Sequence, residues 1–169
     1  MLYKTSLGTK IDICIAPPHQ YVVDHQLELL PGWNAPISYL IIVLQQSSVS
    51  FAKSSDLVTL EKDRLRTKFL RFGSSLIFAL LDRGYQSDIF DPRTGYPMLA
   101  QPGIVLDDNA VVKALLNYPV VDYQKCSLIR HPAWGHQVYP GTIVTAAPQS
   151  VVEPSLQQAV DSQNWTLNN

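Results

Sequence analysis

The spacing of hydrophobic residues predicts two strands in the first third of the chain. Residues 11–16, IDICIA, alternate between faces and stop at Pro17-Pro18, as a short half-buried strand does. Residues 37–46 have an unbroken apolar centre, which is typical of a strand covered on both faces. The polar residues 47–50 are expected to turn into a partner strand that reaches Val58.

Helical periodicity is strongest between residues 61 and 83. Apolar side chains recur there at every third or fourth position, while the basic side chains lie mostly elsewhere. We expect Thr59 to cap this helix, Gly84 to end it, and another element to pack closely against Gly73. The residues expected to face the core are Leu65, Phe69, Phe72, Leu76 and Leu80.

The second half of the chain has the pattern of short strands and turns. Residues 85–90 lead into a predicted tight turn, 91–95, in which the Asp91 carboxylate accepts backbone N–H bonds and Gly95 has a positive φ. The tail, residues 155–169, is polar and is expected to fray. The other predicted elements are helices over 19–30 and 107–116, the latter capped by Asp107 or Asp108, and strands over 123–131 and 142–147.

These elements predict an α+β fold, a mixed sheet with packed helices, in a single domain spanning residues 1–169. A chain of 169 residues is long enough to bury about two thirds of its surface in one core. The composition is 46% hydrophobic with a formal net charge of -1, which predicts a soluble protein without the basic surface of a nucleic-acid or membrane binder. No apolar run approaches the ~20 residues of a membrane span.

Few residue patterns point to catalysis or to metals. The sequence has no glycine-rich phosphate loop, GxSxG or HExxH motif, and its acidic residues are scattered. His131 and His136 flank Pro132 and Gly135, so turn and packing roles are favoured over a metal site. The basic residues of the long helix form either a solvated surface or an anion site; they are Lys62, Arg64, Arg66, Lys68 and Arg71.

The densest cluster of reactive side chains is CSLIRHPAWG, residues 126–135. In an extended strand Cys126, Leu128 and Arg130 share one face. A nearby guanidinium stabilises a thiolate, which would make Cys126 a nucleophile or a soft-metal ligand; the alternative is a buried structural cysteine. Cys14, in an apolar strand, is predicted to be structural. Two cysteines form no disulfide framework, which favours a reducing, cytoplasmic compartment.

Two stretches carry a resemblance to a known family. GYQSDIFDPRTG at 84–95 and KCSLIRHPAWGHQVYPGTIVTAAP at 125–148 resemble the C-terminal domain of the cobalamin trafficking protein D family, also called methylmalonic aciduria and homocystinuria type D protein. Its members carry GY-x-x-D-x-x-DP-x-x-G and, later, C-x-x-IRH-x-x-WG followed by V-x-x-G-[ST]-I. Weaker similarity at IDICIAPPHQY, at Pro31–Trp33 and near Phe69 extends the resemblance over about residues 9 to 155.

The resemblance implies a fold similar to the flavin-dependent nitroreductases, in a variant that has lost the flavin site. It implies a non-catalytic role: passing cobalamin, with a companion cobalamin-processing protein, toward methionine synthase or methylmalonyl-CoA mutase. Cobalamin is then the expected ligand, bound directly or together with the partner, and no flavin is expected. The residues expected to contact cobalamin are Cys126, Arg130, His131 and Trp134.

The sequence departs from the family at one position. Better-studied members have two adjacent cysteines, the first implicated as a thiolate ligand to cobalt. Here the doublet reads Lys125-Cys126, so Lys125 stands at the implicated position. A shift of one residue along a strand turns the side chain to the opposite face. Ligation of cobalt by Cys126 therefore requires a bulge or a loop conformation at this point.

Two alternative functions are compatible with the residues. A flavin-using oxidoreductase of the nitroreductase type would need a phosphate site, for which the candidates are Arg64, Arg66, Lys68 and Arg71. A structural dimerisation module would need no ligand, and a homodimer is also compatible with the adaptor role. A yellow purified protein would favour the oxidoreductase, whereas a shifted corrinoid absorption band would favour the adaptor.

Overall fold

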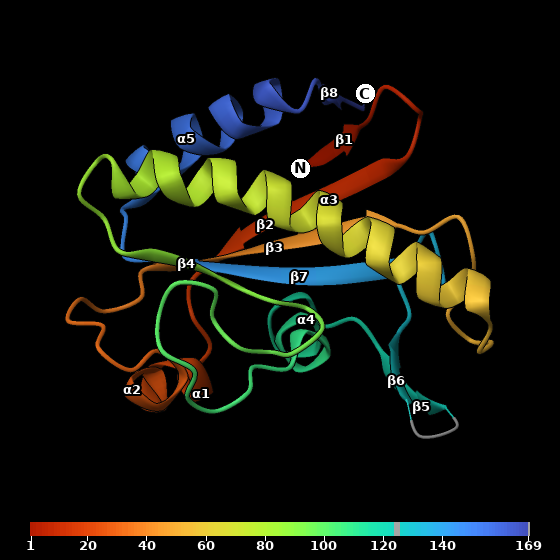
Figure 1. Cartoon of the computed structure of the whole chain (residues 1–169), viewed down its shortest axis with the longest axis horizontal. Helices are drawn as coiled ribbons and strands as arrows, with labels where there is room; N and C mark the ends of the chain where they lie inside the picture. The colour runs from red at the N-terminus through yellow and green to blue at the C-terminus, as the bar shows by residue number, and fades with distance from the viewer. Residues whose placement is uncertain (124–125, 169) are drawn as a thin grey trace.

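A six-stranded antiparallel sheet forms the centre of the molecule (Figure 1). The computed structural model describes residues 1–123 and 126–168, and the side chains of Tyr123 and Cys126 lie outside this description. The strand order is β4-β7-β3-β2-β1-β8. The strands are β1 (Leu2–Lys4), β2 (Lys10–Ala16), β3 (Tyr39–Gln46), β4 (Ser87–Phe90), β7 (Val138–Thr145) and β8 (Thr166–Leu167), and a separate hairpin consists of β5 (Val120–Tyr123) and β6 (Cys126–Ile129).

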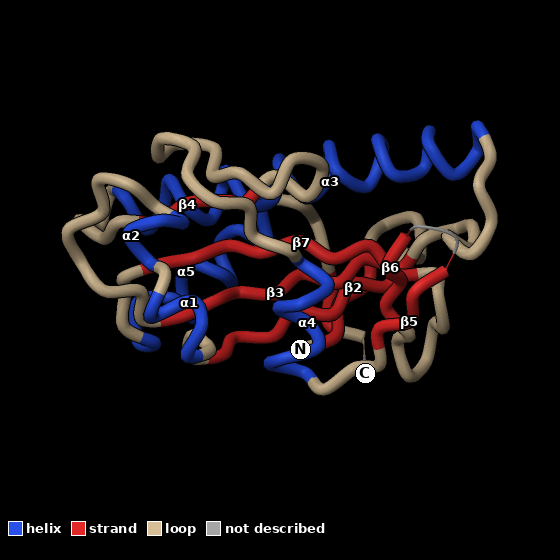
Figure 2. The backbone as a smooth tube through the Cα atoms, turned by 90° about the horizontal axis from the view of Figure 1, so that it is seen from below, coloured by secondary structure: helices blue, strands red, loops and turns tan. Residues whose placement is uncertain are grey.

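Helices cover both faces of this sheet. The long α3 (Asp56–Leu81) and α5 (Gln149–Ser162) lie on one face, and α1 (Gln20–Asp24), α2 (Gln26–Leu29) and α4 (Asp108–Leu116) lie on the other (Figure 1). Seen from below, α1 and α4 lie across the strands (Figure 2). Central β3 is buried on both sides, because Ile41 and Val43 join the α3–α5 core while Leu40 and Ile42 join the opposite core. The predicted two-sided strand is confirmed.

The α+β class is confirmed, whereas the sheet is not mixed as predicted. Every pairing within the six-stranded sheet is antiparallel over the described residues. Strands β3 and β4 do run in the same direction and are joined by α3, as in a βαβ unit. However, β7 enters between them and pairs antiparallel with both. This insertion by a distant segment has no local signal in the sequence.

The core-facing residues of α3 are those predicted: Leu65, Phe69, Phe72, Leu76 and Leu80 are fully buried. Gly73 also packs as expected, because a Cβ there would meet Ile89 Cδ1 at 2.8 Å. The helix starts earlier than predicted, since Ser55 rather than Thr59 is the N-cap and its Oγ accepts from the Val58 N–H at 3.3 Å. Leu57 and Leu60 are exposed, so the first turns lack the apolar periodicity that marks the rest.

Two other expectations need correction. The predicted partner strand over 47–58 is a loop followed by the first turn of α3. Its polar groups bond locally, because Ser47 Oγ donates to Val49 O and Glu61 accepts from the Ser48 N–H. The predicted helix over 19–30 is divided into α1 and α2 at His25.

The C-terminal tail, expected to fray, packs onto the sheet instead. Residues 149–162 form α5, in which Val152, Leu156 and Val160 are buried against the α3 side of the sheet. Trp165 then stacks on Phe72 with ring centroids 4.7 Å apart, and β8 pairs with β1. The few apolar residues of this segment lie at helical spacing. Its overall polar composition therefore gave a misleading expectation of fraying. Among the described residues, no helix is long and apolar enough to cross a membrane.

Candidate functional site

The cobalamin-contact candidates lie on and after the β5–β6 hairpin, which stands at one end of the molecule apart from the main sheet (Figure 1). The predicted single strand over 123–131 is wrong in its bounds, because Tyr123 is the last residue of β5 and β6 covers only Cys126–Ile129. The two strands pair so that Tyr123 is opposite Cys126 and Val120 is opposite Ile129. Lys125 and the side chain of Cys126 lie outside the described residues, so the predicted face and exposure of that thiol stay predictions. The predicted strand over 142–147 corresponds to the second half of β7, which begins earlier, at Val138, and ends at Thr145.

Arg130 and His131 differ sharply in their surroundings. Arg130 is exposed, and its backbone N–H donates to Pro119 O at 2.8 Å. The His131 ring is only 6% exposed and stacks on Trp134 with centroids 3.9 Å apart. Its Nδ1 accepts from the N–H groups of Ala133 and Trp134 at 3.1 and 3.2 Å. Burial lowers the pKa of His131, which suits a neutral ring that organises the turn.

Three of the four candidates therefore have assigned places, but they do not converge on one point. Trp134 is 7% exposed and packs with His131, so these two rings support the segment from within. His136 has a different partner, because its Nδ1 lies 3.1 Å from Ile129 O. The predicted turn and packing roles of the two histidines are confirmed, and no cluster of metal-ligating side chains occurs among the residues described.

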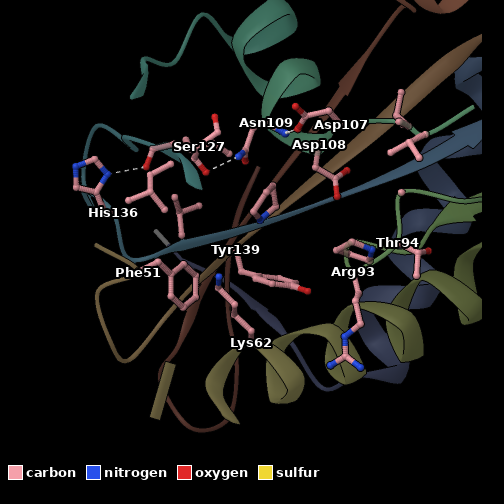
Figure 3. Close-up of a pocket in the computed structure, with 18 residues that line it drawn as sticks. Phe51, Lys62, Arg93, Thr94, Asp107, Asp108, Asn109, Ser127, His136 and Tyr139 are labelled. Atoms are coloured by element: carbon pink, nitrogen blue, oxygen red, sulfur yellow. Dashed lines mark hydrogen bonds between the residues drawn. The ribbon is translucent and has the colours of Figure 1, made fainter. Parts of the chain in front are cut away.

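A cavity of about 380 Å³ lies between the hairpin and the rest of the molecule (Figure 3). Its walls are the first half of α3, the turn after β4, the start of α4, β6 and the start of β7. Donors and acceptors of both charges face it, and they include Lys62, Arg93, Asp108, Asn109, Ser127, His136 and Tyr139. A cavity of this size and polarity fits a small polar molecule.

Asp108 is the most perturbed acid of this cavity. It stands in the first turn of α4, where Asp107 caps the helix by accepting from the Asn109 N–H at 2.8 Å. The Thr142 hydroxyl donates to Asp108 Oδ1 at 2.6 Å. Burial nevertheless raises the pKa of Asp108 to about 7. Tyr139 lies nearby, and burial together with the Asp108 carboxylate raises its pKa as well. Near neutral pH Asp108 can therefore either donate or accept a hydrogen bond.

The turn beside the cavity is built by the GY-x-x-D-x-x-DP-x-x-G stretch. Gly84 ends the turn after α3 with φ +86°, and Gly95 has φ +72°, as predicted for the second of them. The buried Asp88 carboxylate accepts N–H bonds from Met98, Leu99 and Ala100 and so anchors the following loop. The glycines and Asp88 of this motif therefore fix the path of the backbone, so a structural role explains why the motif contains them.

Asp91 also has its expected role, together with an unexpected partner. Its Oδ1 accepts from the Arg93 N–H at 3.0 Å, as predicted for a tight turn. In addition, Arg66 Nε and Nη2 donate to its two oxygens at 2.6 Å each. This bidentate pair lowers the pKa of Asp91. The Arg93 guanidinium in turn pairs with Asp63.

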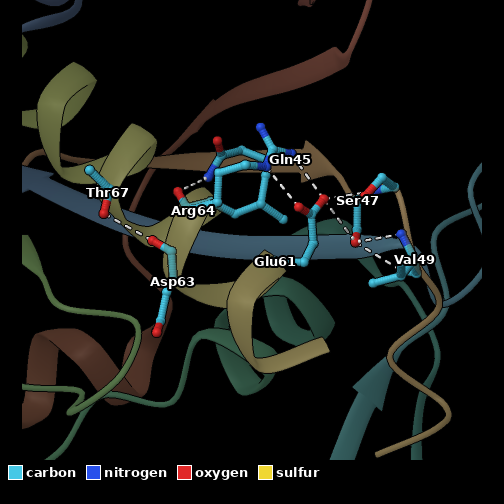
Figure 4. A network of polar contacts seen from close by, with 9 residues as sticks. Gln45, Ser47, Val49, Glu61, Asp63, Arg64 and Thr67 are labelled. Carbon is cyan, nitrogen blue, oxygen red and sulfur yellow. Dashed lines mark hydrogen bonds and ion pairs between the residues drawn. The ribbon is translucent and has the colours of Figure 1, made fainter. Parts of the chain in front are cut away.

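The five basic residues of α3 do not form one surface with a shared role. Arg66 is paired with Asp91, and Arg64 donates to Glu61 from Nε and Nη2 at 2.7 and 2.9 Å (Figure 4). Glu61 also accepts from Ser48 N–H, and the Arg64 contact lowers the pKa of Glu61 to about 2. The Lys62 Nζ lies 5.3 Å from the Phe51 ring centroid, at the cavity. The uniform face predicted from spacing is thus divided among different partners.

Sequence reasoning missed Asp108 and Tyr139 as parts of one site. They come from α4 and β7, which meet only through the fold, and local spacing carries no signal for them. The Asp-Asp pair before an apolar helical pattern indicated a cap, and the structure assigns that function to Asp107. The Asn109 side chain donates to Ser127 O at 2.8 Å and ties α4 to the hairpin.

Comparisons with known proteins agree with the two motif stretches. The family model described as methylmalonic aciduria and homocystinuria type D protein matches residues 6–155. The cobalamin trafficking protein CblD of Homo sapiens is 29% identical over 119 residues, which cover 69% of this chain and 40% of that protein. The proteins of the same name from Rattus norvegicus and Gallus gallus are 28% and 26% identical over 64% and 73% of this chain.

The chain spans about two fifths of the length of these curated relatives. The matched region nevertheless contains both motif stretches, strands β2, β3, β4 and β7 of the central sheet, and all of the cavity walls. The chain therefore belongs to the methylmalonic aciduria and homocystinuria type D protein family.

Proposed function

We propose that this chain is a cobalamin-handling adaptor, which passes the corrinoid toward cobalamin-dependent enzymes without converting a substrate. The observation that carries the proposal is the family match over residues 6–155, with relatives that are named for cobalamin trafficking. The proposal includes a cobalamin-processing partner protein and a cytoplasmic location. It also includes the flavin-free, nitroreductase-like character that the resemblance implies.

The corrinoid is proposed to bind on an open surface. The cavity of about 380 Å³ has the size of a pocket for a small ligand, whereas cobalamin is considerably larger than a drug-sized molecule. The β5–β6 hairpin stands apart from the main sheet and offers such a surface, which a partner protein would complete. This arrangement agrees with an adaptor that holds its cargo together with another protein.

Within that surface we assign different roles to the four candidate residues. Cys126 and the exposed Arg130 are the residues that contact the corrinoid. His131 and Trp134 are buried, so they position this segment through their stacked rings and the turn bonds to His131 Nδ1. The Arg130 guanidinium favours the thiolate form of Cys126, the form that binds a soft metal ion.

The absorption spectrum of cobalamin tests this assignment. Addition of the protein to cob(II)alamin, with and without the partner, is expected to shift the corrin bands, and Cys126→Ser is expected to abolish any thiolate-type shift. Cys14→Ser is the matched control, because Cys14 is half-buried in β2 and should leave the spectrum unchanged. An identical shift in Cys126→Ser would refute thiolate ligation, and the absence of any shift in both mixtures would refute corrinoid binding.

The same preparation tests the flavin-dependent alternative. On this proposal the purified protein is colourless and retains no FMN after gel filtration. Stoichiometric FMN in the protein peak would refute the adaptor proposal in favour of a flavin enzyme.

A further inference from the structure

A second concave site lies on the α3 side of the sheet, away from the β5–β6 hairpin. It is a groove of about 280 Å³ between the middle of α3, the turn joining β1 to β2, and the residues that follow α5. Figure 1 shows these three segments side by side. We call it the basic groove, and its lining includes Thr5, Thr9, Arg64, Lys68, Arg71 and Trp165.

Three cations of α3 line this groove at positions i, i+4 and i+7, so they share one face of the helix. Glu61 accepts hydrogen bonds from Arg64 Nε and Nη2, which leaves the other guanidinium donors available. Neither Lys68 nor Arg71 has a carboxylate partner among the residues described. The basic groove therefore contains more positive charge than the chain itself neutralises.

The position of Lys68 distinguishes this groove from an ordinary solvated helix face. Its ammonium group lies 5.7 Å from the centroid of the buried Trp165 ring. Burial and the nearby Arg64 lower the pKa of Lys68 to about 8. Glu61 partly offsets this lowering, but its carboxylate already accepts from Arg64 and from the Ser48 N–H. The other polar side chains that line the groove beside Lys68 carry no negative charge; they include Arg71, Thr5, Thr9 and Gln163. A further anion bound in the groove would therefore stabilise the half-buried ammonium group of Lys68.

We infer that the basic groove binds a phosphate group, carried either by free phosphate or pyrophosphate or by a small phosphorylated molecule such as a nucleotide. Guanidinium groups and a lysine ammonium are the side chains that bind phosphate oxygens best. Threonine hydroxyls and the Gln163 amide add neutral donors at the edge of the groove. The inference is independent of cobalamin binding, because it concerns residues on the opposite side of the sheet.

Isothermal titration calorimetry of the full chain with inorganic phosphate, pyrophosphate and AMP tests this inference. At least one of them is expected to bind with one-site saturation. Lys68→Gln and Arg71→Gln should each weaken that binding about tenfold or more, as the loss of a contact worth about 1.4 kcal/mol does. Lys113→Gln, an exposed lysine of α4, removes the same charge elsewhere and should leave the affinity unchanged.

The proton balance of binding gives a second, independent measurement. At pH 8 about half of Lys68 is protonated, and a bound anion raises its pKa, so binding should take up as much as about half a proton. This uptake appears as a dependence of the binding enthalpy on the ionisation enthalpy of the buffer, and it should disappear in Lys68→Gln. Absence of saturable binding by all three ligands would overturn the inference, as would equal affinities in the Lys68, Arg71 and Lys113 variants. Tighter binding of AMP than of phosphate and pyrophosphate would identify a nucleotide; otherwise the phosphate group itself is the ligand.

Discussion

The contact between Phe69 and Gly141 provides a quantitative test of how α3 packs on the sheet. Phe69 is fully buried, and a Cβ added at Gly141 in β7 would lie 2.6 Å from Phe69 Cε2 and Cζ. Phe69→Ala should cost about 3–5 kcal/mol of unfolding free energy, because a large buried ring is lost. Gly141→Ala alone should cost about 1–3 kcal/mol, because the new methyl group overlaps a tightly packed ring.

The double variant should behave differently from the sum of the two. With the ring removed, the methyl group introduced by Gly141→Ala enters the vacated space and gains about 0.8 kcal/mol of burial. Replacement of glycine also reduces the entropy of the unfolded chain, which adds about 0.4–1 kcal/mol. The double variant should therefore be about 1–2 kcal/mol more stable than Phe69→Ala, and the coupling energy should exceed about 2 kcal/mol.

Equilibrium unfolding in urea, followed by circular dichroism, measures all four free energies of this cycle. Leu29→Ala is the matched control, because Leu29 is fully buried in the core on the other face of the sheet. Combined with Gly141→Ala, it should give additive effects within about 0.5 kcal/mol. Additivity of Phe69→Ala with Gly141→Ala would show that the ring does not lie on Gly141, and the account of the α3–sheet contact would be wrong.

Three further predictions concern charged and reactive groups. The bond to Arg66 lowers the pKa of Asp91, so this pair stabilises the fold above pH ~4 and the stabilisation is lost as the pH falls below that value. Asp91→Asn should therefore cost about 1.5–3 kcal/mol of unfolding free energy at pH 7 and should flatten the dependence of that free energy on acid pH. An unchanged pH dependence would contradict the pairing. Burial raises the pKa of Asp108, so its contribution to stability is present below pH ~4 and is lost as the pH rises toward 7. The unfolding free energy of Asp108→Asn relative to wild type should therefore rise from pH 4 to pH 8. A constant difference between the two proteins would refute this. A thiol reagent should label native Cys126 much faster than Cys14, whose pKa is raised by burial, and slow labelling of both would end the ligand role of Cys126.

Local patterns predicted the elements whose signals are contained in one stretch of sequence. The core face of α3 follows from its apolar spacing. The turn over 91–95 follows from three residues within one short stretch: the Asp91 carboxylate accepts a backbone N–H, the Pro92 ring restricts φ, and Gly95 adopts a positive φ. The two-sided burial of β3 likewise follows from its unbroken apolar centre. The start of α3 at Ser55 was missed, since its first leucines are exposed.

Features that join distant segments had no such signal. The entry of β7 between β3 and β4 makes the sheet antiparallel, and the Arg66–Asp91 pair joins α3 to the turn after β4. Helical spacing identified the basic residues of α3 but not their partners, so only the structure separates Arg66, which pairs with Asp91, from Arg64, Lys68 and Arg71, which line the basic groove. The neighbouring Pro132 and Gly135 indicated a turn and packing role for His131, but its partners had no local signal, because its stacking on Trp134 and its bond from the Ala133 N–H form only in the folded turn.

The adaptor role is tested most directly by sedimentation velocity monitored at the visible absorption of the corrin ring. The chain is mixed with cob(II)alamin alone and with the cobalamin-processing partner loaded with the same corrinoid. The proposed function predicts that corrin absorbance sediments with the chain in at least one mixture and that the corrinoid is recovered chemically unchanged. Corrin absorbance that sediments without the chain in both mixtures, or catalytic conversion of the corrinoid by the chain, would contradict it.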